Sequence, residues 1–170
     1  MATNLVFSVK SAKYGTPTGS NTMPASGAMT ALSLAVKGSI VIEESAPAFQ
    51  EFTSEWQASP VMINETTPPV LSATIQLYDL NYQDMAALKG GTFASAGGFD
   101  KFTPGTGFTV VQKALEFAMD SGHVLNIFNG HVAARIVSGG GRDKLFALEL
   151  VTKPLVTADL AGDWELKKAQ

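Results

Sequence analysis

Short segments of this chain alternate between apolar and polar residues again and again, and this pattern narrows the possible folds more than any other property. In the segment 71–80, LSATIQLYDL, Ile75 and Leu77 alternate with Gln76 and Tyr78. A period of two predicts a half-buried β-strand. Because such runs recur between turn residues, we predict a mainly β protein, either a β-sandwich or an incomplete barrel of antiparallel strands.

One segment departs from this alternation. Asn81 suits the N-cap of a helix, Met85 and Leu88 then fall on one side, and Gly90 supplies a stop. We therefore predict one short α-helix, about Tyr82–Lys89, on the flank of the sheet.

In the last third of the chain, alternating segments separated by turn residues predict a meander of three or four antiparallel strands. Phe108–Asp120 also fits a helical template, and we favour a strand because β-branched residues open it. Asn129-Gly130 is the strongest hairpin signal in the chain, and a turn there would place His123 and His131 in adjacent strands.

The 170 residues (17.9 kDa) are enough for one domain with a real core, 1–170, and few for two. Segments rich in glycine, proline or polar residues predict a flexible arm at 13–28, a protruding loop or hairpin at 45–60, a flexible connector at 90–107 and a C-terminal tail at 156–170.

Charged residues make up only 16% of the chain, against roughly 25% in an average soluble domain. A chain with so few charged side chains cannot easily form a fully solvated surface, so we expect partner subunits to cover part of that surface. The segments Leu71–Leu80 and Leu145–Val151 are also long and poor in charge, so either would be an aggregation hazard at a sheet edge. Edge-to-edge pairing between copies would remove that hazard, and a closed head-to-tail arrangement gives a ring.

The charges are unevenly distributed, although the net charge is only −3. Between Lys37 and Lys89 there is no basic residue, and the acidic residues there include Glu43, Glu44, Glu51, Glu55 and Glu65. Chance clustering on a solvated face is one reading. The other is an acidic face that meets a basic neighbour or lines a passage.

Three aromatic residues in the acidic segment, Phe49, Phe52 and Trp56, are candidates for a contact with another molecule. Stacking on nucleic-acid bases is disfavoured, because the acidic surroundings repel phosphate. A protein contact is favoured instead.

No catalytic, cofactor or metal site is predicted. The chain has no cysteine, no G-x-S-x-G elbow, and only two histidines without a third ligand at a fixed position. The glycines of 139–144, GGGRDK, link two predicted strands, whereas a phosphate-binding loop joins a strand to a helix. The first residues lack the pattern of a secretory signal and no apolar run is long enough for a membrane helix, so we expect a cytoplasm-like site of synthesis and no membrane partner.

The segments Leu77–Gly91, His123–Leu155 and Ala161–Leu166 together resemble the major tail protein, or tail tube protein, of long-tailed phages. The order of elements over about Thr30–Leu155 is similar to that of this family, which is also similar in fold to the inner-tube subunits of type VI secretion. The resemblance implies a virion protein, assembled in the host cytoplasm, whose copies form hexameric rings that stack around a channel for DNA. Its partners would then be other copies of itself, other tail proteins such as the tape measure or the tail terminator, and DNA passing without sequence specificity.

Under this reading, the acidic set Glu43, Glu44, Glu51, Glu55 and Glu65 would face the lumen or a neighbouring subunit. The aromatic set Phe49, Phe52 and Trp56 would form the contact between stacked rings, so that Trp56→Ala would leave rings but block long tubes. The alternatives are the inner tube of a contractile tail or injection system, a capsid decoration protein, and a carbohydrate-binding β-sandwich module.

Overall fold

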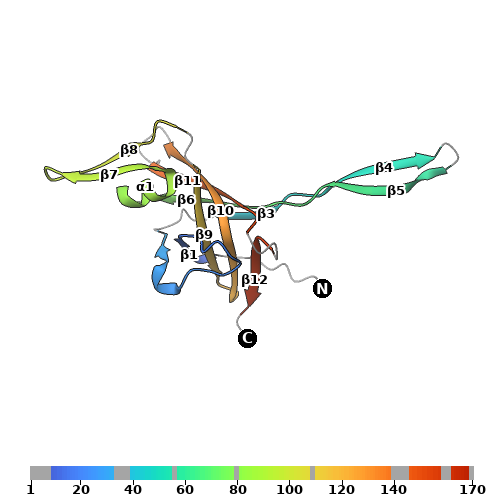
Figure 1. Ribbon diagram of the computed structural model, residues 1–170, viewed down its shortest axis with the longest axis horizontal. Helices are drawn as coiled ribbons and strands as arrows, with labels where there is room; N and C mark the ends of the chain where they lie inside the picture. The colour runs from blue at the N-terminus through green and yellow to red at the C-terminus, as the bar shows by residue number, and fades with distance from the viewer. Residues whose placement is uncertain are drawn as a thin grey trace.

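A computed structural model of the chain (Figure 1) describes residues 9–32, 39–54, 57–78, 81–107, 110–138, 146–157 and 162–168. These residues form a mainly β, antiparallel structure with one α-helix, which confirms the predicted fold class. The elements are β1 (Val9–Gly15), a 3-10 turn (Ser26–Ala28), β2 (Thr30–Ala31), β3 (Val41–Glu44), β4 (Ala48–Ser54), β5 (Gln57–Thr67), β6 (Leu71–Tyr78), α1 (Tyr82–Lys89), β7 (Gly91–Ala96), β8 (Phe99–Pro104), β9 (Val111–Met119), β10 (His123–Ser138), β11 (Phe146–Pro154) and β12 (Trp164–Lys168).

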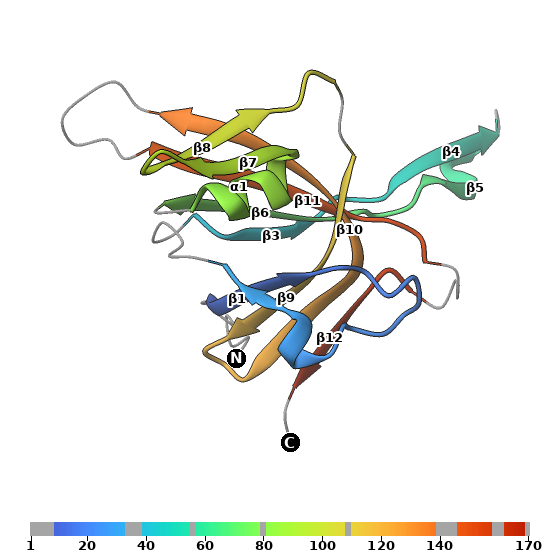
Figure 2. The same cartoon turned by 60° about the vertical axis from the view of Figure 1, so that its left-hand side comes forward.

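The body of the molecule consists of two layers that belong to one eight-stranded sheet. One layer contains β2, β1, β9 and the first part of β10, with β12 beside it (Figure 2). The other contains the second part of β10, followed by β11, β6 and β3. The predicted strand over Phe108–Asp120 is β9, and the predicted meander is β9, β10 and β11.

The long strand β10 joins the two layers. Its register with β9 shifts between Ile127 and Gly130, as at a β-bulge, and its pairing partner on the other side changes there from β12 to β11. The prediction of a hairpin turn at Asn129-Gly130 is therefore wrong, because β10 continues through both residues.

Gly130 is needed for a close approach of strands. A Cβ atom at this position would lie 2.6 Å from Cγ2 of Thr152 in β11 and 3.2 Å from Cδ1 of Leu115 in β9. A glycine inside a strand is typical of such places as well as of turns. A glycine is therefore required at this position, but the reason is the crowding of three strands and not a turn.

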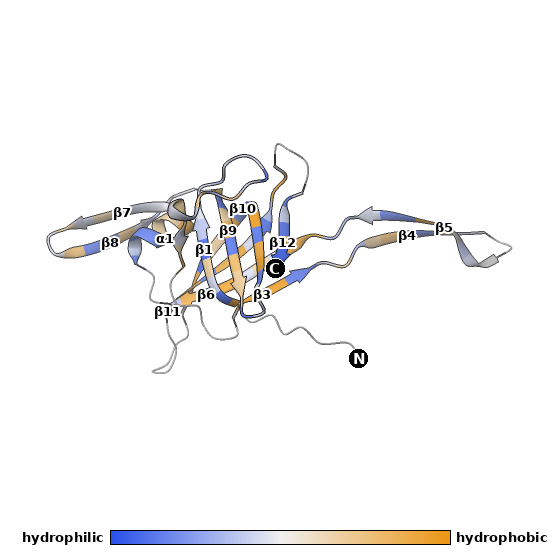
Figure 3. Cartoon of the chain, turned by 90° about the horizontal axis from the view of Figure 1, so that it is seen from below, coloured by the Kyte–Doolittle hydropathy of each residue, from blue (hydrophilic) through white to orange (hydrophobic). Residues whose placement is uncertain are grey.

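The core lies between the two layers. The alternation in β6 is confirmed, because Leu71, Ala73, Ile75 and Leu77 are buried while their neighbours are half-buried. Other fully buried side chains come from β9, β10 and β11: Leu115, Phe117, Ile127, Leu148 and Leu150. These side chains fill the space between the layers, as in a small barrel that leaves no channel. Figure 3 shows hydrophobic segments throughout the strands of the body and further ones along the two hairpins that project from it.

The helix begins and ends where the sequence predicts. The side-chain oxygen of Asn81 accepts a hydrogen bond from the backbone N–H of Asp84 at 2.7 Å. Gly90 ends the helix with φ of 77°, a value that favours glycine. Met85 and Leu88 are its buried residues.

The helix α1 closes one end of the space between the layers. Leu88 packs in the main core, and the Tyr14 hydroxyl of β1 donates a hydrogen bond to the Asp84 carboxylate at 2.6 Å. Burial, with the neighbouring carboxylate, raises the pKa of Tyr14 above its usual value. The Lys113 ammonium lies 5.6 Å from the centre of the Tyr14 ring, over its face. These contacts fix the helix against β1 and β9.

Two hairpins project from opposite sides of this body (Figure 1). The long arm, formed by β4 and β5, leaves the sheet between β3 and β6. It includes most of the segment predicted to protrude at 45–60 and continues to Thr67. The short arm, formed by β7 and β8, follows α1.

The prediction of a flexible connector at 90–107 is wrong, because the short arm is a regular hairpin. Gly97 and Gly98 at its tip have φ of 65° and 80°, which suits the tight turn of a two-residue hairpin loop. The strands themselves contain threonine and phenylalanine, which favour β-structure, but their alternation was hidden by the many small residues.

Two further boundary predictions need correction. The segment predicted as a flexible arm, 13–28, begins inside β1, because residues 13–15 pair with β9. The segment predicted as a C-terminal tail, 156–170, contains β12, which pairs with the first part of β10. In both cases pairing with a strand far away in the sequence overrides the local composition.

Candidate assembly surface

Among the described residues, no group of three or more histidine, aspartate or glutamate side chains could hold a metal ion. His123 and His131 are not in adjacent strands as predicted but in the same strand, β10. His123 Nδ1 lies 2.9 Å from the hydroxyl of Ser121. No helix in the described part of the chain is long and apolar enough to cross a membrane.

The long arm exposes large apolar side chains. Four of them are well exposed: Phe49 (57%), Phe52 (39%), Met62 (53%) and Ile63 (56%). Single exposed apolar residues are ordinary on a protein surface. Four on one hairpin, away from the core, are typical of a segment that contacts another molecule.

The cross-strand register gives the long arm two different faces. Gln50 pairs with Asn64 and Phe52 with Met62, so these four side chains form an uncharged face. Phe49 pairs with Glu65 and Glu51 with Ile63, so these four form an acidic face on the other side. Each face therefore combines two large apolar side chains with two polar ones, and only one face is charged.

The root of the long arm is also acidic. Glu43 and Glu44, both exposed, end β3 and share a shallow hollow with Val70 and with Lys153 of β11. Ser45 fixes this root, because its hydroxyl accepts a hydrogen bond from the N–H of Val70 at 2.9 Å and its own N–H donates to the Val70 carbonyl at 3.0 Å. The arm thus leaves the sheet at a defined place.

The short arm has a different character. Phe99 at its tip is 80% exposed, and Phe93 is also exposed. The arm carries charges of both signs, Asp100 and Lys101, next to this tip. A Cβ atom at Gly91 would lie 2.4 Å from the Thr103 carbonyl oxygen, so the hairpin is tightly closed at its base.

The sheet edges are short. The strands β6 and β11, which correspond to the two segments predicted to be hazardous at an edge, are both paired on both sides. Within the described residues the edge strands of the sheet are β2, with two residues, β3, with four, and β12, with five. The strand β3 hydrogen-bonds to β6 on one side, and no other described strand pairs with its other side.

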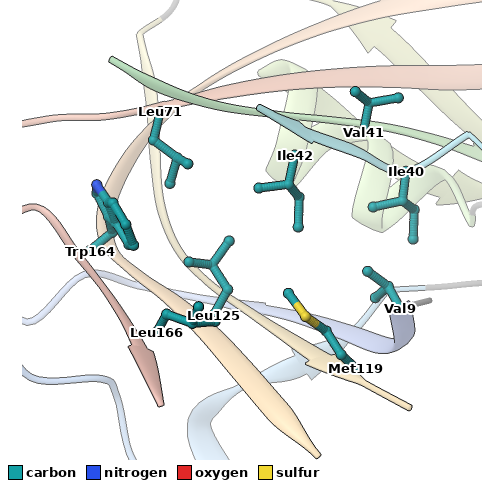
Figure 4. A pocket seen from close by; sticks show the side chains of 9 residues that line it. All are labelled: Val9, Ile40, Val41, Ile42, Leu71, Met119, Leu125, Trp164 and Leu166. Carbon is teal, nitrogen blue, oxygen red and sulfur yellow. The ribbon is translucent and has the colours of Figure 1, made fainter. Parts of the chain in front are cut away.

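An apolar groove of about 390 Å³ lies beside this open edge, between β3 and β12. It is at the opposite end of the core from α1, because Leu71 at the beginning of β6 lines it. The nine described side chains that line it are all apolar, and in Figure 4 Ile42 of β3 and Leu71 of β6 lie across an open space from Leu125 of β10 and Trp164 of β12. On the β12 side they include Trp164 and Leu166, which are 36% and 48% exposed.

A buried polar contact holds β12 in place as one wall of the groove. The side-chain amide of Asn126, which is fully buried in β10, donates a hydrogen bond to the Glu165 carboxylate at 2.6 Å. This hydrogen bond, together with Lys167 at 3.2 Å, lowers the pKa of Glu165. Since Glu165 faces Asn126, the alternating residues Trp164 and Leu166 face the groove.

A second charged contact spans three strands of the other layer. The Arg135 guanidinium of β10 donates a hydrogen bond to the Glu149 carboxylate of β11 at 2.5 Å, and Gln76 of β6 donates to its other oxygen at 3.0 Å. The hydrogen bond from Arg135, and then that from Gln76, lowers the pKa of Glu149. This contact stabilises the layer from which the long arm projects.

The structure brings some of the predicted residues together and separates others. Phe49 and Phe52 are both on the long arm, but on opposite faces. Glu51 and Glu65 share the acidic face, and Glu43-Glu44 lies at the root. Glu55 and Trp56 lie outside the described residues.

Sequence reasoning missed the apolar partners of these residues. Met62 and Ile63 belong to the segment 61–65, VMINE, whose pattern is typical of a strand but does not assign that strand to the hairpin. The groove residues on β12 were missed because a strand of only five residues has no clear local signature.

No protein-family model matches this chain, and no curated protein sequence matches it significantly.

Proposed function

We propose that this chain is a structural subunit that assembles with copies of itself into stacked rings, the tail tube of a long-tailed phage. The observation that carries the proposal is the pair of arms on opposite sides of the body, each with exposed apolar side chains (Figure 1). A head-to-tail contact between identical subunits needs two different surfaces, and a closing rotation between them gives a ring. The resemblance of the chain to tail tube proteins supports the same assembly.

A passage for DNA would have to lie between copies. The eight strands of the sheet enclose a filled core, as small barrels do, whereas barrels of about 16–18 strands are needed for an aqueous channel. A wider channel therefore requires strands from several subunits. The open edge of β3 and the long arm are the described elements that could contribute them.

The acidic segment suits a passive channel. Basic groups hold DNA by releasing counterions from its phosphates, so a lumen without them lets DNA slide. We assign Glu43, Glu44 and the acidic face of the long arm to the lumen or to a neighbouring subunit. Replacing Glu43 and Glu44 by lysine should slow DNA ejection while tubes still assemble, and unchanged ejection would contradict a lumenal position.

Self-assembly is tested with the purified chain alone. We expect annular particles or tubes by negative-stain microscopy, and a shift from single subunits to multimers by mass photometry as concentration rises. A variant in which residues 48–67 are replaced by a short glycine-rich turn is the control, since it keeps the body and loses the long arm. A wild-type chain that remains a single subunit at high concentration would refute the proposal.

A further inference from the structure

The apolar groove between β3 and β12 remains open at one end of a core that is otherwise filled. We propose that this groove receives the uncharged face of the long arm from a neighbouring copy of the chain. This inference rests on the proposed function, because it names the two surfaces that meet in one subunit contact.

The lining of the groove favours a polypeptide over a small molecule. Sites for small molecules combine apolar walls with a few polar groups that orient the ligand, whereas the nine described side chains that line this groove are all apolar. The polar groups beside the groove are instead the backbone N–H and C=O groups on the open side of β3. A strand that pairs with this edge can satisfy them and place alternate side chains in the groove.

The uncharged face of the long arm has the matching pattern. Phe52 and Met62 form an exposed cross-strand pair, flanked by Gln50 and Asn64, so no charge would be buried with them. The arm cannot fill the groove of its own subunit, because it starts beside the groove and projects away from the body (Figure 1). The occupant must therefore be the arm of another copy.

Charged residues of both signs lie at the rim of the groove. With the uncharged face in the groove, Glu51 and Glu65 on the other face remain near solvent, where an acidic hairpin benefits from nearby cations. Lys168 lies on the groove side of β12, and Lys10 follows the lining residue at the start of β1. Neither lysine forms an ion pair with a described residue. The acidic pair Glu43-Glu44 also lies at the rim, at the end of β3 where the subunit's own arm begins, because Glu44 pairs with Leu71 of the groove lining.

Disulfide trapping tests the contact cleanly because the chain has no cysteine. Met62→Cys places a thiol on the uncharged face, and Leu166→Cys places one in the groove; both side chains are about half exposed, so the fold should tolerate the changes. When the two single variants are mixed and oxidised, we expect a disulfide-linked dimer. The double variant should give a ladder of higher multimers, because each copy then carries both halves of the contact.

Two matched pairs identify the face and the arm. Ile63→Cys mixed with Leu166→Cys tests the acidic face of the same arm, and Phe99→Cys mixed with Leu166→Cys tests the short arm. We expect a crosslinked fraction at least tenfold lower for both pairs than for Met62 with Leu166. Circular dichroism confirms that each variant is folded.

The outcomes separate this inference from the proposed function. Multimers that form without the Met62–Leu166 crosslink overturn the inference and leave self-assembly standing. A crosslink that forms equally well or better from Ile63 or Phe99 also overturns it, because another face or the other arm then occupies the groove. A wild-type chain that is a single subunit at all concentrations, with no crosslink from the variants, overturns both.

Discussion

Replacing Phe52 by alanine should weaken assembly while the fold of the single subunit stays intact. Phe52 is 39% exposed, and a phenylalanine side chain offers roughly 200 Å² for burial, so about 80 Å² remain available to a partner. At ~25 cal/mol per Å², burying this area stabilises one contact by about 2 kcal/mol. The loss corresponds to a Kd about 30-fold higher for each subunit contact.

Mass photometry over a concentration series measures this effect. We expect the concentration at half-assembly to rise roughly 10- to 30-fold, and the melting temperature of the unassembled subunit to change little, since Phe52 is outside the core cluster. Val156→Ala is the control, because Val156 is 66% exposed but lies on neither arm. Assembly of Phe52→Ala at the wild-type concentration, or an equal loss with Val156→Ala, would refute the reasoning.

Substitutions at three further positions test the fold. Gly130→Ala should lower the free energy of unfolding by about 1–3 kcal/mol in urea denaturation, since the added Cβ would lie 2.6 Å from a methyl carbon of Thr152; an unchanged stability would contradict the close approach. Asn81→Ala should cost about 1 kcal/mol in thermal denaturation through loss of the helix cap, and Asn81→Asp should restore it; an equal loss in both variants would argue against capping. Glu149→Gln removes a carboxyl whose pKa is lowered in the folded state by Arg135. In the wild type this carboxyl stabilises the fold above its unfolded pKa, and that stabilisation disappears as pH falls through the folded pKa. The difference in unfolding free energy from wild type should therefore be largest at neutral pH and shrink in acid, and a difference that does not depend on pH would exclude this ion pair as its cause.

The features predicted correctly from sequence are those with a local physical cause. The helix was predicted with its correct ends, because Asn81 and Gly90 act on backbone groups within one turn of themselves. The buried face of β6 was predicted because alternate residues of a strand point to opposite sides. Neither inference depends on which strands become neighbours.

The errors arise where distant parts of the chain decide the outcome. Gly130 resembles a turn residue until the crowding by β9 and β11 is known. The five-residue strand β12 exists because β10 offers it a partner, with Asn126 buried against Glu165. For the exposed pair Phe52 and Met62, the sequence predicts Phe52 as a contact residue. It does not predict Met62, because the cross-strand neighbour of Phe52 depends on the register of the arm.

The distribution of edges and arms changes the reason why this chain would need partners. The sequence predicts that other copies of the chain pair with the edges of the long apolar strands. In the structure, however, β6 and β11 are paired on both sides within the subunit. The described edge strands that remain, β2, β3 and β12, are only two, four and five residues long, which limits uncontrolled pairing. What remains for a partner is specific: short edges, the apolar groove between β3 and β12, and a hairpin whose apolar pair lies outside the core. Because such surfaces are directional and different from each other, they favour ordered head-to-tail assembly over general aggregation.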